Sequence, residues 1–362
     1  MRTRLALTML VAGAVWCLSA GVASAATWHV HPGESIQVAV NNAHPGDTIR
    51  LAAGVYRQNV TIRKNQITLV GAGRGPHGSR IVLSSQPTPS VCNSPGSVNG
   101  ICILGQIDQN FNPMTPVRGT TVKRLSVRGF TGFGVFMFNA ADTTVTQVTA
   151  RRNSGYGISG FVLSGITFTR SVARDNGEPG FYIGDSPHAN AWVVGNKAFH
   201  NGVGGEGIGM LFRDSSFGHV AHNTSFGNCV GMLFIDTGEP GGEAHWHAAH
   251  NQANRNNGAC PGETNGPPPL SGLGIGFIGV QDSVLRHNWT FRNHPAGPSA
   301  WSGGIVVATA APAGGADPMA NLLKGNRARN NGPFDIAYDG SGSGNMFVNN
   351  RCGTSSPSSI CH

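Results

Sequence analysis

Five aspartates close short apolar runs, and a serine or threonine follows each: Asp142, Asp185, Asp214, Asp236 and Asp282. Two interpretations stay open. Aspartate followed by Ser or Thr is ordinary turn chemistry, in which the side chain caps nearby backbone amides. If Asp185, Asp214 and Asp236 instead lie close together, they predict a Ca²⁺ site, because calcium prefers several oxygen ligands.

Basic side chains also recur in register. His222, His250 and His287 each directly precede an asparagine, and His219 and His247 share a second register. Stacked imidazoles predict either a packed corner or a transition-metal site. A further register contains arginines, whose alternatives are packing on an outer face or a track for an anionic polymer. These arginines are Arg151, Arg152, Arg174, Arg255, Arg292 and Arg329.

The elements that must position these residues follow from an internal repeat. An asparagine is followed five residues later by another at Asn196/Asn201, Asn223/Asn228, Asn251/Asn256, Asn288/Asn293, Asn326/Asn331 and Asn345/Asn350. Most units continue with a strand-like run introduced by glycine. A unit of about 23 residues cannot bury its own apolar face, so copies must stack on each other.

Stacked units predict an all-β fold, a parallel β-helix built as a single-stranded solenoid over residues 26–362. An asparagine at the same corner of every coil can bond to those above and below, which satisfies buried polar groups. At the start, Ile36, Ala39, Val40 and Ala43 share one helical face, so we expect a short helix capping the first coil.

Later units are longer than earlier ones, and the extra residues are rich in Gly and Pro. They occupy residues 237–244, 259–272, 295–303 and 309–320, with an earlier loop at 84–118. Insertions on one side of a solenoid often wall its binding face. We therefore expect a groove along the glycine-introduced strands; the alternative is that the loops only decorate the coil.

Both the Asn units and the opening segments (residues 33–43, 45–49 and 54–56) resemble the right-handed parallel β-helix repeats of the pectate-lyase-like superfamily. The resemblance covers about residues 28–350 and implies the fold. It implies no single activity, because this fold carries lyases, hydrolases, esterases, epimerases and non-catalytic proteins.

Residues 180–188 are similar to the Tyr-Gly-x-Asp-Pro-His segment of β-helix mannuronan epimerases, although Ser186 interrupts the match and no acidic residue follows the histidine. The resemblance implies that Tyr182 and His188 exchange a sugar proton while Asp185 polarises or orients the substrate. Arg213, between the corners at Asp185 and Asp236, is the candidate that stabilises the enolate-like charge.

The N-terminus predicts export. Arg2 and Arg4 precede an apolar stretch, and Ala23-Ser24-Ala25 offers a cleavage site, so residues 1–25 read as a signal peptide. That stretch is too short to span a bilayer comfortably, and no later apolar stretch is long enough for a transmembrane helix, so no membrane insertion is expected. We predict a secreted protein, in the extracellular or envelope space.

Cysteine spacing agrees with export, because the six cysteines after residue 25 form three near-neighbour couples. They predict the disulfides Cys92–Cys102, Cys229–Cys260 and Cys352–Cys361. The formal charge of +8 suits an anionic partner. No recognised nucleic-acid-binding module is present, so no nucleic-acid partner is predicted, and a monomer is expected.

Two functional classes remain. The first is a secreted carbohydrate-active protein that acts on an acidic, uronate-containing polysaccharide by β-elimination or C5 epimerisation. The second is a non-catalytic carbohydrate- or metal-binding envelope protein that resembles the periplasmic copper-delivery β-helix proteins. Whether the chain is an enzyme stays open at this point, and calcium is the only cofactor predicted.

Overall fold

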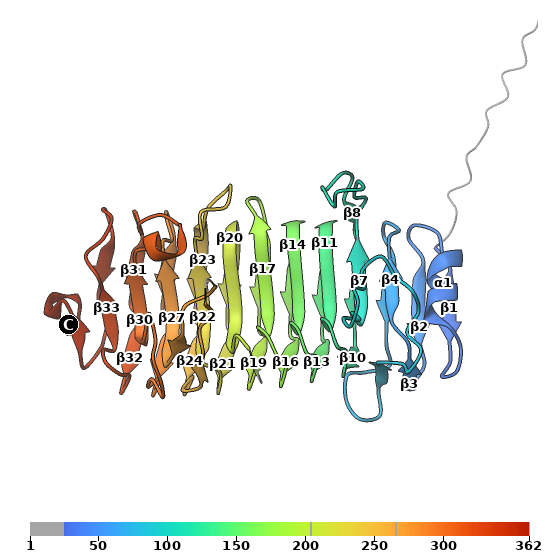
Figure 1. Ribbon diagram of the computed structural model, residues 1–362, viewed down its shortest axis with the longest axis horizontal. Coiled ribbons are helices and arrows are strands. Elements are labelled where there is room, and N and C mark those ends of the chain that lie inside the picture. The colour runs from blue at the N-terminus through green and yellow to red at the C-terminus, as the bar shows by residue number, and fades with distance from the viewer. Residues whose placement is uncertain (1–24, 203–204, 265, 362) are drawn as a thin grey trace, which may run out of the picture.

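The computed structural model describes residues 25–202, 205–264 and 266–361. The predicted signal peptide lies outside the described residues, apart from Ala25. The coils line up along the long axis of the molecule, with the only α-helix of the described residues at one end and the C-terminus at the other (Figure 1). Successive coils add strands to three parallel sheets, so the predicted right-handed parallel β-helix is confirmed.

Sheets A and C share one long strand, β20 (Ile208–Ala221), which turns from one sheet into the other. The remaining strands of sheet A are β1 (Thr27–Val30), β2 (Thr48–Leu51), β5 (Thr68–Val70), β9 (Thr121–Lys123), β12 (Thr144–Thr146), β15 (Thr167–Thr169), β18 (Ala191–Val194), β23 (Ala244–Ala249), β28 (Val284–Arg286), β31 (Leu322–Lys324) and β34 (Met346–Val348).

Sheet C holds the glycine-introduced strands. Its other members are β4 (Val60–Ile62), β7 (Ile101–Leu104), β8 (Val117–Arg118), β11 (Val135–Ala141), β14 (Ile158–Ser164), β17 (Phe181–Ser186), β22 (Val230–Ile235), β27 (Leu273–Ile278), β30 (Gly303–Ala308), β33 (Ile336–Tyr338) and β35 (Ser355–Ser356).

Sheet B joins the other two sheets. It consists of β3 (Gly54–Arg57), β6 (Ser79–Val82), β10 (Leu125–Arg128), β13 (Thr149–Arg151), β16 (Val172–Arg174), β19 (Lys197–Phe199), β21 (Thr224–Phe226), β24 (Gln252–Asn254), β29 (Trp289–Phe291) and β32 (Arg327–Arg329). An antiparallel pair, β25 (Ala259–Cys260) and β26 (Leu270–Ser271), and two 3₁₀ turns, η1 (Ala311–Ala313) and η2 (Ser358–Ile360), lie outside the sheets.

Side chains that point into the coil form one continuous core. In sheet B, the inward positions of successive strands are Ala150, Ala173 and Ala198, all fully buried. In sheets A and C they are mainly larger aliphatic and aromatic residues. Strand pairing across coils satisfies the backbone groups, so this narrow interior is mainly apolar, with Ser225 and Thr290 at the same inward position in β21 and β29.

The predicted capping helix is α1 (Ile36–Asn42). Its N-cap Ser35 accepts a hydrogen bond from the Val38 backbone N–H, and Ile36, Ala39 and Val40 are buried. The amphipathic spacing read from the sequence therefore places one face of this helix on the first coils, where it shields the open end of the core.

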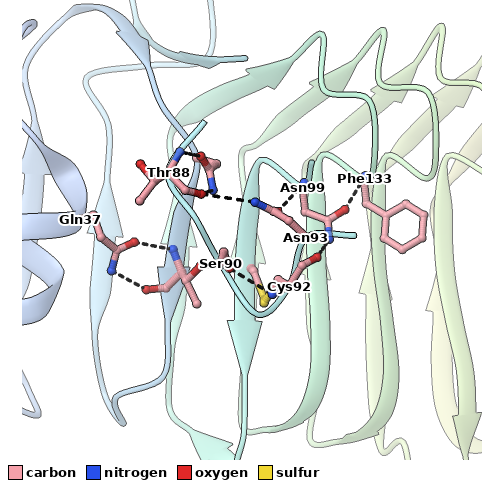
Figure 2. Close-up of a disulfide and its surroundings, with 10 residues drawn as sticks. Gln37, Thr88, Ser90, Cys92, Asn93, Asn99 and Phe133 are labelled. Atoms are coloured by element: carbon pink, nitrogen blue, oxygen red, sulfur yellow. Dashed lines mark hydrogen bonds between the residues drawn. A yellow bond between two sulfur atoms is a disulfide. The ribbon is translucent and has the colours of Figure 1, made fainter. Parts of the chain in front are cut away.

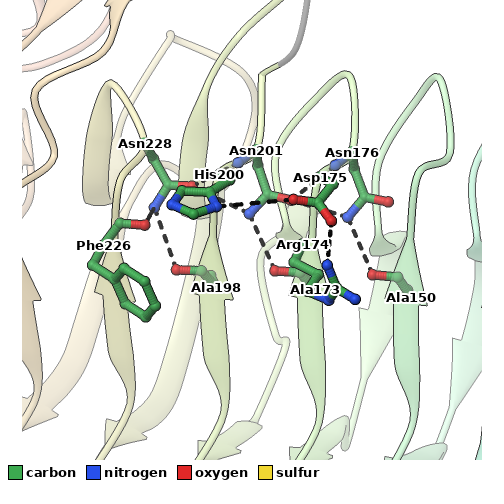
Figure 3. A network of polar contacts seen from close by, with 10 residues as sticks. All are labelled: Ala150, Ala173, Arg174, Asp175, Asn176, Ala198, His200, Asn201, Phe226 and Asn228. Atoms are coloured by element: carbon green, nitrogen blue, oxygen red, sulfur yellow. Dashed lines mark hydrogen bonds and ion pairs between the residues drawn. The ribbon is translucent and has the colours of Figure 1, made fainter. Parts of the chain in front are cut away.

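Asparagine ladders run along two corners of the coil, as predicted. In one ladder, Asn196 donates through Nδ2 to Asn223 Oδ1 at 3.1 Å and to the Phe168 carbonyl oxygen at 2.8 Å. Figure 3 shows the second ladder at Asn176, Asn201 and Asn228, where each amide bridges neighbouring coils. Every amide in these rows is buried and bonded, so the corner is sealed without unsatisfied groups.

The last repeat differs from the sequence-based alignment. Asn350 accepts from Asn326 Nδ2 at 3.0 Å and so continues the first ladder, and Asn345 accepts from Asn321 at 2.9 Å in a separate register. The expected pairing of Asn345 with the first ladder is therefore wrong. The second ladder ends instead where Asn331 donates to the Asp335 carboxylate at 2.9 Å.

All three predicted disulfides are present: Cys92–Cys102, Cys229–Cys260 and Cys352–Cys361. The first fastens the early loop onto the coils, and Figure 2 shows it beside Asn99, which accepts from the Phe133 backbone N–H at 2.8 Å. No helix among the described residues is long and apolar enough to cross a membrane.

Candidate functional site

Sheet C brings most of the predicted site residues together. Tyr182 and Asp185 belong to β17, and Arg213 and Asp214 to the neighbouring β20. Gly184 pairs with Arg213 and Ser186 with Ser215, so Asp185 lies beside Asp214. Arg213 pairs in turn with Ile235, which places Asp236 at the same corner of the next coil. The three aspartates predicted to share a corner therefore do so.

The guanidinium of Arg213 is the centre of this group. Its Nη2 lies 3.4 Å from Asp185 Oδ1, and its Nε lies 3.4 Å from Asp214 Oδ2. Its Cζ lies 5.7 Å from the ring centroid of Tyr182. Burial lowers the pKa of Arg213, but the neighbouring Tyr182, Asp185 and Asp214 outweigh it and raise the pKa above its ordinary value. Arg213 is a fixed positive charge on the outer face of sheet C.

Tyr182 packs beneath Arg213 and is 1% exposed. Its ring is parallel to that of Tyr156 at a centroid distance of 4.9 Å and tilted against Phe161 at 4.8 Å. Burial raises the pKa of its hydroxyl, which has no hydrogen-bond partner among the described residues. A Cβ on Gly184 would lie 1.9 Å from this hydroxyl, so only glycine leaves room for it.

His188 does not join this group. It lies on the exposed turn after β17, and its ring stacks on Phe217 at a centroid distance of 5.7 Å. Phe217 stacks in turn on His245 at 4.5 Å. His188 is therefore part of an aromatic column at the next corner rather than a partner of Tyr182.

Two of the three aspartates of the shared corner, Asp214 and Asp236, act as caps. Asp214 is fully buried and accepts from the Thr237 backbone N–H at 2.6 Å and from the Thr237 hydroxyl at 2.5 Å. Asp236 accepts from the backbone N–H groups of Gly238 at 2.8 Å and Ala316 at 3.0 Å. Each carboxylate oxygen of Asp214 and Asp236 therefore already accepts a hydrogen bond from the protein.

Among residues 25–202, 205–264 and 266–361, no three His, Cys, Asp or Glu side chains are placed to hold a metal ion. Calcium binding therefore stays a prediction from the sequence. The other two aspartates of the series, Asp142 and Asp282, lie outside this corner, because Ala141 pairs with Ser164 and Gln281 pairs with Ala244.

The predicted histidine stacks are present. The rings of His222, His250 and His287 stack along one corner at centroid distances of 5.1 and 5.4 Å. His219 Nδ1 and His247 Nδ1 lie 3.3 Å apart on adjacent coils of sheet A. Burial and the neighbouring Arg286 and His219 lower the pKa of His247.

Three of the four later loops, at residues 259–272, 295–303 and 309–320, lie over sheet C, but they cover it instead of walling an open groove. Leu211, Leu233, Ile235 and Val306 point outward from sheet C into a second buried apolar cluster. Loop residues close this cluster from outside, among them Leu270 and Ala310. The open part of the sheet C face is therefore confined to the earlier coils.

A cleft of about 560 Å³ opens at those coils, where the chain passes from the second Asn ladder into β11, β14, β17 and β20. Phe133 and Tyr156 form an aromatic wall, stacked at 4.8 Å, and Arg213 lines the cleft from the sheet. The remaining lining includes Ser97 of the early loop, Ser154, Glu178, Glu206, Leu211, Glu263, Pro267 and Leu270.

Three glutamates of this cleft escaped the sequence analysis. Burial raises the pKa of Glu178 to about 7, and the nearby Glu206 and Glu263 add to the shift. Burial also raises the pKa of Glu206, and Arg213 partly opposes this rise. Their positions in the repeat could have identified them. Each glutamate directly follows a glycine in the loop after an asparagine of the second ladder, at residues 177–178, 205–206 and 262–263.

This arrangement can perform acid–base chemistry. A carboxyl group whose pKa is near 7 exists in both protonation states at neutral pH, so it can take up or release a proton. Arg213, in the same cleft, can bind an anionic group of a ligand. The cleft therefore combines a proton carrier, a cation and an aromatic wall.

Comparison with known proteins identifies the fold family. The family described as right handed beta helix region matches residues 43–215 and 133–352. No curated protein matches the chain.

Solved structures agree in fold. The A-module of the mannuronan C-5 epimerase AlgE4 from Azotobacter vinelandii has a TM-score of 0.57 at 17% identity, over 88% of this chain and 89% of that chain. Pectate lyase Pel9A has a TM-score of 0.50 at 17% identity, over 79% of each chain. An alginate lyase from Paenibacillus sp. str. FPU-7 has a TM-score of 0.51 at 13% identity, over 88% and 99%.

Proposed function

This chain belongs to the right-handed β-helix family, and from that premise we propose that it is a carbohydrate-active protein that processes an acidic, uronate-containing polysaccharide. The reaction is β-elimination or C5 epimerisation. The solved structures of similar fold include a mannuronan epimerase, a pectate lyase and an alginate lyase, which supports this substrate class. At such low identity they support it by fold alone, so the site must supply the chemistry.

The observation that carries the proposal is the placement of Glu178 and Arg213 in one cleft. Both reactions begin with removal of the proton next to the uronate carboxylate. That step needs a base and a positive charge that stabilises the enolate-like product of deprotonation. Glu178, with a pKa raised by burial to about 7, is the base in this proposal, and Arg213 binds the substrate carboxylate.

The residues singled out by the epimerase resemblance take part in the same proposal. Asp185 and Tyr182 hold the Arg213 side chain in position through the contacts described above. The proton-transfer pair that the resemblance implies, Tyr182 and His188, is the alternative to Glu178, although His188 lies at the next corner and Tyr182 is buried. Substitution distinguishes the two sets, because Glu178→Gln removes the first base and the double change Tyr182→Phe/His188→Gln removes the second.

Product assays on defined polymers test this function. Polymannuronate, alginate and polygalacturonate are incubated with the purified protein; ultraviolet absorbance of unsaturated uronate reports elimination, and proton NMR reports epimerisation. We expect product from at least one polymer, and a loss of about 100-fold or more in Glu178→Gln. Absence of both products from every polymer would remove the enzymatic proposal.

A binding protein without catalytic activity is the second candidate function. It is favoured by the histidine pair of sheet A, whose Nδ1 atoms lie 3.3 Å apart. Imidazole nitrogens are common ligands of zinc, copper and nickel. Calorimetric titration with these ions, compared between the wild type and His247→Ala, tests this candidate; heat that persists in the variant would speak against it.

We also propose that the protein is exported. Three disulfides are typical of proteins in an oxidising compartment, such as the extracellular space or the periplasm. This location suits a polymer-processing protein, because long polysaccharides lie outside the cytoplasm. Cell fractionation, with N-terminal sequencing of the recovered chain, tests export and the predicted cleavage after Ala25.

A further inference from the structure

The outer face of sheet B carries a column of arginines on adjacent coils. Arg128 pairs with Arg151, and Arg151 pairs with Arg174. The residues next to them, Ala150 and Ala173, are fully buried in the core, so the three arginines point away from it. Neighbouring strands are roughly 4.8 Å apart, so the three coils that contain β10, β13 and β16 each present one arginine at about this spacing.

Little negative charge compensates this column. Arg174 forms an ion pair with the carboxylate of Asp175. Asp175 Oδ1 also lies 3.9 Å from His200 Nδ1 (Figure 3). Across the part of the chain that the structure describes, no carboxylate forms an ion pair with Arg128 or Arg151. Burial and the surrounding arginines lower the pKa of Arg151. Like charges held this close repel each other, and a bound anion relieves that repulsion.

Aromatic rings continue the arginine column along the sheet. Arg174 pairs with Phe199, and its Cζ lies 5.8 Å from the Phe199 ring centroid. Phe199 stacks on Phe226 of the next coil at 4.8 Å, with the two rings nearly parallel. Such rings offer flat apolar surface beside the charges, and the C–H faces of sugar rings pack on surfaces of this kind.

The column borders the cleft across one corner of the coil. Arg151 is followed by the corner residue Asn153 and then by Tyr156 of the cleft wall. Arg174 is likewise followed, four residues on, by Glu178. A polymer held along sheet B can therefore pass over the second Asn ladder into the cleft, where the glutamates alone would repel an anionic chain.

We propose that the outer face of sheet B around Arg128, Arg151 and Arg174 is a second binding surface, which holds a linear anionic polysaccharide and leads it to the cleft. The identity of the polymer rests on the proposed function. Guanidinium groups bind carboxylates through paired, charge-assisted hydrogen bonds, so one arginine per coil fits a polymer with a carboxylate on each sugar. Phe199 and Phe226, the aromatic rings that extend the arginine column, favour a polymer made of sugar rings over an anionic partner that lacks such rings.

A charge-matched comparison tests the surface. Calorimetry measures the affinity of the full chain for alginate, polygalacturonate, neutral dextran and a single-stranded DNA oligonucleotide at low and moderate salt. The test variant is Arg128→Gln/Arg151→Gln. The control is Arg286→Gln/Lys324→Gln, which removes two exposed charges from paired positions on sheet A. Circular dichroism and the thermal midpoint confirm that both variants fold.

We expect the test variant to bind the acidic polymer at least about fivefold more weakly than the control does. Its affinity should also depend less steeply on salt concentration. Neither the wild type nor either variant should bind dextran. Equal losses in both variants, or no loss in either, would overturn the proposal. DNA binding as tight as that of the polysaccharide, and lost in the same variant, would overturn the choice of polymer. If the arginines bind the polymer but no product forms, this surface stands and only the proposed function fails.

Discussion

Glu243 is a carboxyl group buried in the loop that follows β22. It is 1% exposed, and its Oε2 accepts from the Ser215 backbone N–H at 2.8 Å. Its Oε1 has no hydrogen-bond partner among the described residues. Burial raises its pKa well above the ordinary value, and the nearby Asp214 and Asp236 add to this effect. The folded protein therefore favours the protonated form of Glu243 more strongly than the unfolded chain does.

This difference predicts how stability depends on pH. Above the ordinary pKa of 4.5, the folded state binds more protons than the unfolded state, so stability falls as pH rises toward the folded pKa. Glu243→Gln mimics the protonated group and removes this loss, which is at most about 1.4 kcal/mol per pH unit. Thermal melts should show the variant gaining on the wild type as pH rises above about 5. Glu239→Gln, exposed in the same loop, is the control and should gain nothing.

Glu178 predicts a pH dependence of activity with the opposite sign. A general base must be ionised, so kcat/KM should rise with pH and level off above about 7, the raised pKa of Glu178. Because Glu206 contributes to that rise, Glu206→Gln should move the inflection to lower pH. A profile that is flat through neutral pH, or an inflection that Glu206→Gln leaves in place, would exclude Glu178 as the base.

At the scale of elements, the corners of the coil were the most predictable feature. An asparagine that must be buried at the same corner of each coil leaves an in-register signal in the sequence, and both ladders formed as expected. The last repeat was misaligned because Asn321, Asn326 and Asn331 are also five residues apart. Asn345 and Asn350 pair with Asn321 and Asn326, although the spacing fits Asn326 and Asn331 equally well. Spacing alone cannot distinguish two ladders that share the same interval.

The ladder also predicts a stability effect. Asn228 donates to Asn256 Oδ1 at 3.0 Å and accepts from Asn201 Nδ2 at 3.2 Å. Asn228→Leu leaves these buried groups unsatisfied and should cost about 3 kcal/mol or more. Denaturant unfolding measures this change. Asn110→Leu, the same substitution at an exposed site, should cost little; equal effects would mean that the ladder bonds contribute nothing special.

The position of the candidate site in the whole molecule was only partly predictable from the sequence. Sequence spacing placed Tyr182, Asp185 and Arg213 on one sheet, because stacked coils align equivalent positions. It could not show that later loops bury the outer face of the later strands of that sheet. The apolar contacts of Leu233 and Ile235 with loop residues join positions far apart in the sequence. Nor could it bring Glu178, Glu206 and Glu263 together, because their loops differ in length and lie outside the repeat.

Loops shape access to the outer face of sheet C over the part of the molecule that the structure describes. Loops cover sheet C over the later coils, the early loop closes its other end near Ser97, and the cleft remains between them. The arginine column of sheet B lies beside this opening. The central claim is that this cleft removes the proton next to a uronate carboxylate, which is the step common to elimination and epimerisation.

Loss of that hydrogen to solvent tests the claim most directly, because elimination and epimerisation both remove it from C5. A polymer labelled with deuterium at C5 is incubated in ordinary water, and mass spectrometry of the recovered sugars measures the label that is lost. The wild type and Glu239→Gln should lose deuterium at similar rates, while Glu178→Gln and Arg213→Gln should be slower by about 100-fold or more. Full retention of the label with the wild type on every uronate polymer, or loss at the wild-type rate with Glu178→Gln and Arg213→Gln, would contradict the account.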